Sequence, residues 1–262
     1  MSSRMRWSPK QYLKFADHRS RPALDLIHQI PVDHPGRVYD LGCGPGNITN
    51  LLAERWPGAS VTGVDSSAEM LARAKADFPE IEWREGDISA WSVDDPVDVI
   101  FSNAALQWLD DHQSLFPGLL SMLAPGGVLA VQMPKNFTSP SHALRDEVAS
   151  SGPWADLLAP LHRKAPVLPP DFFYDLLAPG AASIDIWETE YSHILDGDDP
   201  VLEWISGTAL KPYLDAFDRA DEAGWKEEFL DRYKKRLNEA YPKRNDDRTL
   251  FPFRRLFIVA VK

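Results

Sequence analysis

Residues 38–47 read Val38-Tyr39-Asp40-Leu41-Gly42-Cys43-Gly44-Pro45-Gly46-Asn47, so three glycines stand directly behind a short apolar run. This pattern is typical of a strand that turns into a helix around a nucleotide. The spacing is G-x-G-x-G, whereas a dinucleotide site has G-x-G-x-x-G, with a third glycine where the helix packs around a pyrophosphate. Asn47 stands at that third position. The turn is therefore predicted to hold an adenosine ligand without a pyrophosphate.

The chemistry of the turn favours S-adenosylmethionine. Gly42, Gly44 and Gly46 lack a Cβ atom, so the backbone can turn sharply and approach a ligand. The next helix offers unpaired N–H groups and a positive dipole end, which suit the carboxylate of a methionine moiety. The alternative is a tight turn with no ligand. Cys43 is interpreted as a small residue in a crowded turn, rather than as a catalytic thiol.

Strands and helices alternate through the first half of the chain. Helical spacing and turn signals separate the apolar runs, which implies parallel βαβ units with right-handed crossovers in an α/β fold. Ligands in such open sheets bind at the carboxyl ends of the strands. The predicted strands are residues 37–41, 59–64, 81–84, 97–101 and 128–132, the last of them after a Pro125-Gly126-Gly127 turn.

Polar residues follow four of these strands: Asp40, Asp65, Asp87 and Asn103. Asp65 offers two acceptor oxygens for the two ribose hydroxyls, and its alternative is a cap for the helix that starts near Ser67. Asp87 offers a carboxylate to an adenine amino group, and Ile88 a backbone N–H to a ring nitrogen. A solvated turn aspartate is the alternative for Asp87. We expect all four residues to line one rim.

Bulk properties exclude several classes of function. The 262 residues carry a formal charge of −11, which argues against a nucleic-acid partner. The single cysteine cannot form an internal disulfide, and no apolar run reaches the roughly 18 residues of a membrane span. The N-terminus lacks the apolar core of a signal peptide. Seven histidines show no metal-binding spacing. We expect a soluble cytoplasmic protein with no metal.

The second half of the chain has a different character. Prolines are frequent between residues 137 and 182, which predicts short helices. Residues 183–193 and 255–262 are predicted strands, and residues 199–235 are predicted helices, with Trp225, Phe229, Tyr233 and Leu237 spaced by four. We expect a cofactor-binding core over residues 1–136, a mostly helical substrate cap over 137–253 interrupted by a core strand at about 183–193, and a final core strand over 254–262.

The order of these motifs resembles the class I S-adenosylmethionine-dependent methyltransferases. The glycine turn, Asp65, Asp87 and the stretch FSNAALQW at residues 101–108 stand where that superfamily has its motifs. The resemblance implies a Rossmann-like sheet of seven strands whose last strand, RLFIVAVK, runs antiparallel. Enzymes that methylate nucleobase amino groups usually carry D/N-P-P-Y/F after the fourth strand. This chain has Ser102-Asn103-Ala104-Ala105 instead, which disfavours that acceptor.

A closer resemblance, to the trans-aconitate 2-methyltransferase family, covers nearly the whole chain. It is carried by QYLKFADHRSRPALDLI, YDLGCGPGN, SNAALQWLDDH, GGVLAVQMPKN, SGPW, VLEWISGTALKPYL and RRLFIVAVK. The resemblance implies methyl transfer from S-adenosylmethionine to a carboxylate of a small polycarboxylic acid. It places Tyr12, Phe15 and Arg21 over the cofactor, and Gln107, Trp108 and His112 beside the methyl group. Lys211 stands where the family pattern has arginine.

The predicted site has two sets of binding residues. A carboxylate is already ionised at neutral pH and needs no general base, so cations that anchor the other carboxylates are expected instead. Solvated surface charge is the alternative for each cation. The predicted cofactor-binding residues are Tyr12, Arg21, Asp40, Gly42, Gly44, Gly46, Asp65, Ser66, Met70, Asp87, Ile88 and Asn103. The predicted substrate-binding residues are Arg163, Lys211, Arg254 and Arg255.

Two other functions stay open from the sequence. The first is a methyltransferase for another small nucleophile such as a phenol, which would need a base, with His112 as the candidate. The second is a protein that binds S-adenosylmethionine without catalysis. The oligomeric state has no signal in the sequence.

Overall fold

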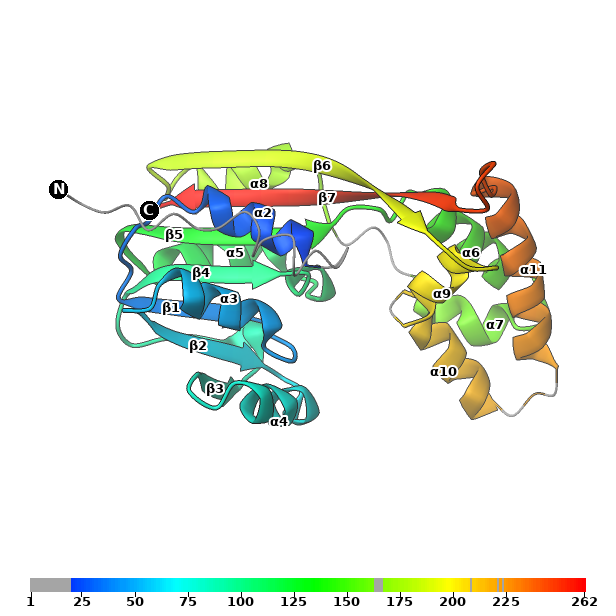
Figure 1. Cartoon of the computed structure of the whole chain (residues 1–262), viewed down its shortest axis with the longest axis horizontal. Helices are drawn as coiled ribbons and strands as arrows, with labels where there is room; N and C mark the ends of the chain where they lie inside the picture. Colours follow the sequence, from blue (N-terminus) through cyan, green and yellow to red (C-terminus); the bar gives the residue numbers. More distant parts are fainter. Residues whose placement is uncertain (1–19, 163–166, 208, 221, 223) are drawn as a thin grey trace. The chain divides into compact units, whose positions relative to one another are not determined.

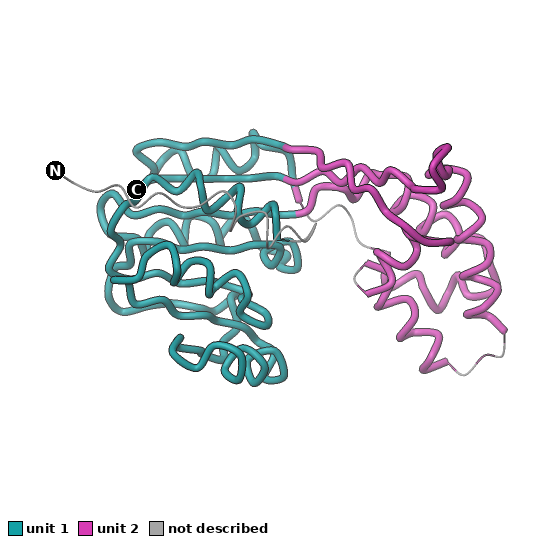
Figure 2. The backbone as a smooth tube through the Cα atoms, viewed as in Figure 1, with its two compact units in different colours: residues 1–133, 168–188, 256–262 teal, residues 134–167, 189–255 magenta. Residues whose placement is uncertain are grey.

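The computed structural model describes residues 20–162, 167–207, 209–220, 222 and 224–262. The chain divides into two compact units, coloured separately in Figure 2. Unit 1 takes its described residues from 1–133, 168–188 and 256–262, and unit 2 from 134–167 and 189–255. The last two strands in the chain, β6 (Ser183–Leu195) and β7 (Thr249–Val261), contribute residues to both units.

Seven strands form one sheet in the order β3-β2-β1-β4-β5-β7-β6. The pairs β1/β2, β2/β3, β1/β4 and β4/β5 are parallel. Strand β7 runs antiparallel to β5, because Lys262 N donates to Gly127 O at 2.9 Å while Lys135 N donates to Arg254 O at 2.8 Å. This confirms the predicted Rossmann-like sheet. The other strands are β1 (Arg37–Leu41), β2 (Ser60–Asp65), β3 (Glu82–Glu85), β4 (Val97–Asn103) and β5 (Leu123–Pro134).

Helices cover both faces of the sheet in unit 1. Figure 1 shows α2 (Arg21–Gln29) and α3 (Asn47–Arg55) on one face, and α5 (His112–Ser121) and α8 (Pro170–Leu177) on the other. Helix α4 (Ala68–Asp77) follows β2. Between β3 and β4 there is one short turn of helix, η1 (Ile88–Ala90), and after it the Trp91 ring meets Tyr39 of β1 at 5.1 Å between centroids. An aromatic side chain thus covers part of the sheet beside this short connection.

The strand order places the site. The chain moves outward from β1 through β2 to β3, then returns to β4 on the other side of β1. Ligands in open α/β sheets bind at such a reversal, outside the carboxyl ends of the strands. The glycine turn follows β1, and a second short helix, η2 (Leu106–Trp108), follows β4. Both segments therefore lie where the fold favours a ligand.

Unit 2 is mostly helical. Its core gathers Trp154, Phe229 and Tyr233, which are all fully buried. The spacing by four predicted one helix through Phe229, Tyr233 and Leu237, and α11 (Trp225–Ala240) confirms it. The remaining elements are α6 (Pro140–Ser151), α7 (Ala155–Leu158), η3 (Ala159–Leu161), α9 (Pro200–Ser206) and α10 (Lys211–Ala220).

Three details differ from the predictions. Helix α6 has 12 residues, so the expectation that all helices in this proline-rich segment are short was wrong. Pro140 occupies its first turn, where a missing N–H costs no hydrogen bond. Strand β5 begins at Leu123, and the predicted Pro125-Gly126-Gly127 turn is an irregularity inside it. Helical spacing with Leu71 and Ala74 predicts that Met70 is on the buried face of its helix, yet it is 41% exposed. None of the described helices is long and apolar enough to cross a membrane.

Candidate active site

Backbone hydrogen bonds hold the glycine turn against β2. Gly42 N and Cys43 N donate to Val64 O at 2.8 and 3.1 Å. Gly42 has a φ of +78°, and a Cβ added there would lie 2.2 Å from the Cβ of Ala105. Since Ala105 follows β4, the turns after two neighbouring strands meet at Gly42. Backbone conformation and packing both require glycine at this position.

Gly44 and Gly46 have different surroundings. Gly46, with a φ of +85°, precedes α3, and a Cβ added there would lie 2.5 Å from the Trp83 ring. Gly44, with a φ of +54°, has no described heavy atom within 4 Å of an added Cβ. Of the three glycines, Gly44 is therefore the one whose backbone is open to a ligand.

Asp40 lies inside β1 rather than after it, which corrects the expectation that it follows the strand. Its side chain is buried, and Oδ2 accepts a hydrogen bond from Thr49 Oγ1 of α3 at 2.6 Å. Burial raises the pKa of Asp40 to about 7; the Asp65 carboxylate adds to the rise, and the Thr49 hydrogen bond opposes it. Asp40 thus ties the strand to the helix on either side of the turn.

Cys43 has no sign of activation. Burial raises the pKa of its thiol well above the ordinary value, and the carboxylates of Asp40 and Asp65 raise it further. The thiolate is the reactive form of cysteine, so this environment disfavours a nucleophile. The surroundings of Cys43 agree with the interpretation of a small residue in a crowded turn.

Asp65, the last residue of β2, bridges the turn and the start of α4. Its Oδ2 accepts from Gly44 N at 2.8 Å, and its Oδ1 accepts from Ser67 N at 2.9 Å. The helix cap itself is Ser67, whose hydroxyl accepts from Met70 N at 3.3 Å. Each carboxylate oxygen takes one of these bonds and keeps a further acceptor position. The geometry leaves room for the predicted ribose contact, which stays a prediction.

The outer part of the predicted cofactor rim is exposed. Ser66 and Met70 are exposed, and Ile88 is half-buried. Asp87 caps η1, and its Oδ1 accepts from Ser89 N and Oγ at 2.9 and 2.8 Å. These hydrogen bonds lower the pKa of Asp87. The carboxylate is therefore ionised and oriented, as an adenine amino group would require.

The carboxyl end of β4 carries buried acceptors. Asn103 Oδ1 and Gln107 Oε1 are both buried and accept no hydrogen bond from the described part of the chain. Gln107 Nε2 donates to Ala104 O at 2.6 Å. Ala104 itself has a φ of +55°, a left-handed conformation that few residues other than glycine adopt. Backbone strain and unsatisfied acceptors occur together here, as they often do at functional sites.

The other two residues predicted beside the methyl group have opposite environments. Trp108 is 52% exposed. His112 is buried between Phe116 and Phe173, with ring centroids 5.4 and 5.6 Å away, and its Nε2 lies 2.8 Å from Leu106 O. Because a carbonyl only accepts, Nε2 carries the proton in this bond. His112 thus joins η2 to the core through its ring and one nitrogen.

A cleft of about 490 Å³ lies beside this segment within unit 1. Trp108 forms one wall, Trp91 and Ile88 come from the short connection after β3, and Leu115 and Leu119 come from α5. The cleft therefore adjoins both Ile88 of the predicted adenine site and Trp108 of the predicted methyl site.

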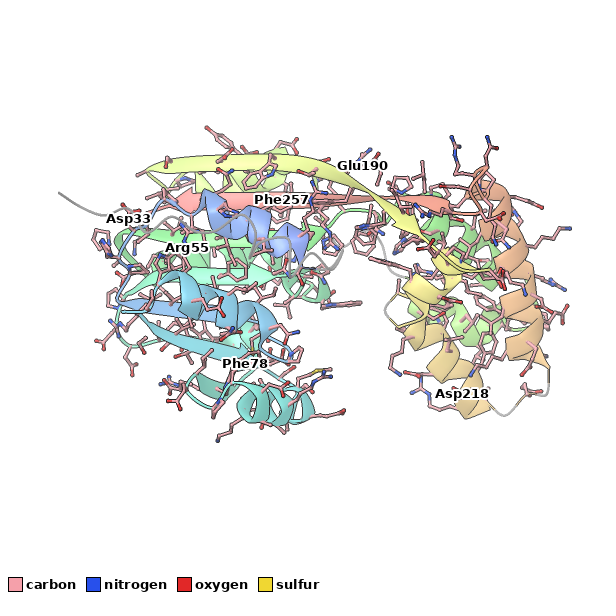
Figure 3. All side chains as sticks on the ribbon, in the orientation of Figure 1. Asp33, Arg55, Phe78, Glu190, Asp218 and Phe257 are labelled. Atoms are coloured by element: carbon pink, nitrogen blue, oxygen red, sulfur yellow. The ribbon has the colours of Figure 1, made fainter. Side chains whose placement is uncertain are left out.

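The predicted substrate cations lie in unit 2. Lys211 Nζ contacts both carboxylate oxygens of Asp215, at 2.9 and 3.0 Å, and is exposed. Arg254 lies 3.5 Å from Glu190, which Figure 3 labels, and is also exposed. Arg255 is buried, with its guanidinium carbon 4.6 Å from the centre of the Phe253 ring. Burial lowers the pKa of Arg255 to about 10, with Tyr191 opposing.

Some predicted residues have no described environment. Tyr12, Phe15 and Arg163 lie outside the described residues. Arg21 is described, at the start of α2, where its Nε lies 3.9 Å from Asp25. The predicted contacts of these four residues with cofactor or substrate stay predictions.

Two residues that position the site had no signal in the sequence. Thr49 stands nine residues after its partner Asp40, a spacing that belongs to no motif. Trp83 of β3 fills the space left by Gly46 and Gly63. Only the folded chain brings these residues to their partners beside the turn.

Comparison with known proteins identifies the family. A family model described as "Methyltransferase domain" matches residues 38–127. A trans-aconitate 2-methyltransferase of Azoarcus sp. is 50% identical over 98% of this chain and 99% of its own length. A protein of the same name from Methylobacterium radiotolerans is 45% identical, with 98% of each chain covered. The chain belongs to the trans-aconitate 2-methyltransferase family. It is a methyltransferase.

Solved structures support the fold. The YcgJ protein from Bacillus subtilis matches with a TM-score of 0.58 at 15% identity, covering 92% of this chain and 98% of its own. A Haemonchus contortus phosphoethanolamine N-methyltransferase 2, solved with S-adenosylhomocysteine, matches with a TM-score of 0.54 at 18% identity, covering 92% and 52%. At these identities the matches show the fold alone, and the family membership confirms the prediction of an S-adenosylmethionine-dependent methyltransferase.

Proposed function

We propose that this chain methylates a carboxylate of trans-aconitate with S-adenosylmethionine, forming the monomethyl ester. The observation that carries the proposal is the 50% identity to a trans-aconitate 2-methyltransferase across 98% of the chain. Relatives at 44–45% identity from several other bacteria have the same name. Such identity extends through both compact units, so it includes the segments outside the cofactor-binding core.

The residues of unit 1 fit the cofactor. Gly44 leaves backbone open to a ligand, and the N-terminus of α3 supplies N–H groups for its carboxylate. Asp65 retains acceptor positions for the ribose, and Asp87 is oriented for the adenine. Asn103 Oδ1 and Gln107 Oε1 are buried acceptors that need a partner. Tyr12 and Arg21 are proposed to cover the cofactor from the N-terminal segment.

The reaction needs positioning more than proton transfer. A lone pair of the acid's carboxylate oxygen forms the O–CH₃ bond, the S–CH₃ bonding pair returns to sulfur, and no proton moves. Alignment of oxygen, carbon and sulfur contributes up to roughly 7–11 kcal/mol at the limit. His112 fits this scheme, since its Nε2 is bonded to Leu106 O in an aromatic setting rather than placed as a base.

Arg255 is the best candidate anchor for the carboxylates that do not react. A buried guanidinium binds a carboxylate more strongly than an exposed one, because water competes less. Arg255 is buried, whereas Lys211 and Arg254 are exposed and contact Asp215 and Glu190. We propose that residues 137–253 supply substrate recognition, and that Arg255, just beyond that segment, is the main cation.

The remaining features of the proposal concern the setting of the enzyme. The acceptor is a small molecule, and the net charge of −11 disfavours a nucleic-acid partner. A reducing cytoplasm suits a chain whose single cysteine is buried and unactivated. The chemistry requires no metal, because the substrate is already an anion and the methyl group is already activated.

A kinetic panel tests the proposed substrate. S-adenosylhomocysteine formation is measured with trans-aconitate, cis-aconitate, citrate and isocitrate. We expect kcat/KM to be highest for trans-aconitate, and turnover with none of the four acids would refute the proposal.

In the same assay, Arg255→Lys should raise the KM for the acid about tenfold or more, because a point charge replaces a bidentate fork. Arg254→Lys is the matched control and should change it little. Equal effects would remove Arg255 from its proposed role.

A further inference from the structure

The buried acceptors after β4 lie in a locked segment. Gln107 Nε2 donates to Ala104 O, and a carbonyl oxygen can only accept, so this bond fixes which end of the amide is which. Gln107 Oε1 must therefore be the opposite end, and it is buried with no donor among the described residues. Gln107 is only 4% exposed. The orientation of this oxygen is determined by the fold rather than by free rotation.

Asn103 has the same unmet requirement four residues earlier. It ends β4 beside Gln132 of β5, and Ala104 N donates to Gln132 O at 2.9 Å. Its Oδ1 is buried without a described donor. An unsatisfied buried acceptor costs about 1–3 kcal/mol, and native chains rarely keep two so close in sequence without a reason. A ligand that brings positively polarised hydrogens would satisfy both.

Charge distinguishes the two cationic groups of the cofactor. The ammonium group keeps its charge throughout the reaction, so a carboxylate suits it. The sulfonium group, in contrast, loses its positive charge as the methyl group is transferred. A carboxylate beside the sulfur would therefore stabilise the ground state more than the transition state, and would slow the reaction. Neutral amide oxygens orient a methyl group through C–H···O contacts with a much smaller penalty of this kind.

We propose that Asn103 Oδ1 and Gln107 Oε1 form a neutral acceptor pair for the sulfonium methyl group. The proposal rests on the proposed cofactor and names the atoms that recognise its reactive end. Ala104 contributes indirectly, because its left-handed backbone directs its carbonyl to the Gln107 amide. The pair distinguishes the methylated sulfonium from the neutral thioether that remains after transfer.

Binding of two ligands to the same protein sample tests the pair without any acid present. Calorimetry gives the Kd of S-adenosylmethionine and of S-adenosylhomocysteine for the wild type, Asn103→Leu and Gln107→Met. Each substitution should lower the preference for S-adenosylmethionine by roughly three- to fivefold, the size of a C–H···O contact. Gln113→Leu, which removes an exposed amide of α5, should leave the preference unchanged.

Asn103→Asp tests the opposite case, because it replaces a neutral amide oxygen with a charged carboxylate. The added charge should raise the preference for S-adenosylmethionine and lower kcat, because it stabilises the sulfonium before transfer. Loss of the Gln107–Ala104 hydrogen bond should weaken the binding of both ligands equally, so it cancels in the ratio of the two Kd values. If the Gln107 variant does not fold, the two Asn103 variants decide the test. Unchanged ratios in folded Asn103 variants would overturn the proposal. The ester assay is independent, so it can succeed while this test fails.

Discussion

The carboxyl ends of β1 and β4 lie side by side in the sheet, yet their polar groups are arranged in opposite ways. At the end of β1, Asp40 is bonded to Thr49, and Asp65 of the neighbouring strand β2 is bonded to Gly44 of the turn and to Ser67. At the end of β4, two buried amide oxygens have no donor among the described residues. The first end is stabilised by its own contacts, and we propose that a ligand completes the second end.

This difference indicates two roles. The β1 end sets the shape of the cofactor site, so substitutions there are expected to change folding stability and all ligand affinities together. The β4 end is proposed to recognise the ligand, so substitutions there are expected to change the preference between ligands with smaller effects on stability. The following predictions test this division, from the largest expected effect to the smallest.

The largest effect is expected from the charge of Asp40. Its pKa of about 7 in the folded chain lies above the ordinary 3.8, so the folded chain binds this proton more tightly than the unfolded chain. The stabilising contribution is fully present below about pH 4 and is lost as pH rises through about 7, up to roughly 4 kcal/mol. When urea unfolding is followed from pH 4 to 8, Asp40→Asn should remove this part of the pH dependence of the free energy of unfolding. An identical slope in both proteins would contradict the buried, proton-binding Asp40.

Gly42→Ala should disturb the contact between the two ends. A Cβ would overlap Ala105 and occupy a left-handed conformation, so we expect a loss of about 3 kcal/mol in the free energy of unfolding. Gly44→Ala is the matched control, because it has the same backbone penalty without the overlap, and should lose about 1 kcal/mol. Urea unfolding gives both values. Equal losses would mean that the Ala105 contact relaxes freely.

Asp65→Ala should weaken the cofactor and the scaffold together. Gly44 N and Ser67 N lose their acceptor, and the ribose loses its proposed partner, so cofactor binding should weaken by about 1–3 kcal/mol. Calorimetry with S-adenosylmethionine and S-adenosylhomocysteine should show equal losses for both. Unchanged affinity would mean that Asp65 bonds only to Gly44 and Ser67 and not to the cofactor. Unequal losses for the two ligands would mean that Asp65 discriminates between them, as the β4 end is proposed to do.

The sequence predicted the β1 end better than the β4 end. The glycine turn and the Asp65 position are local patterns, and the structure places both as expected. Asp40 was expected to follow a strand and to line the rim, whereas it is buried in β1 against Thr49, a contact that no local pattern predicts. The left-handed Ala104 and the fixed Gln107 amide have no sequence signature, because the Gln107–Ala104 and Ala104–Gln132 hydrogen bonds are seen only in the folded chain. Motifs identify the turn, whereas contacts identify the acceptor atoms.

The smallest effect has the opposite sign. Ala104→Gly removes the left-handed penalty but adds freedom to the unfolded chain, so thermal unfolding should show a gain of at most about 0.5 kcal/mol. A loss above 1 kcal/mol would show that packing of the Ala104 methyl group stabilises the fold by more than the left-handed backbone destabilises it.

The central claim is that this chain forms a methyl ester on a tricarboxylic acid, and the identity of the product tests it most directly. Trans-aconitate labelled with oxygen-18 in its carboxylates is incubated with the enzyme and S-adenosylmethionine, and the product is analysed by mass spectrometry before and after mild base. We predict one added methyl group and full retention of oxygen-18 in the ester. Mild base should then restore the free acid and release methanol that carries one oxygen-18. A base-stable product, or no added methyl group, would contradict the account.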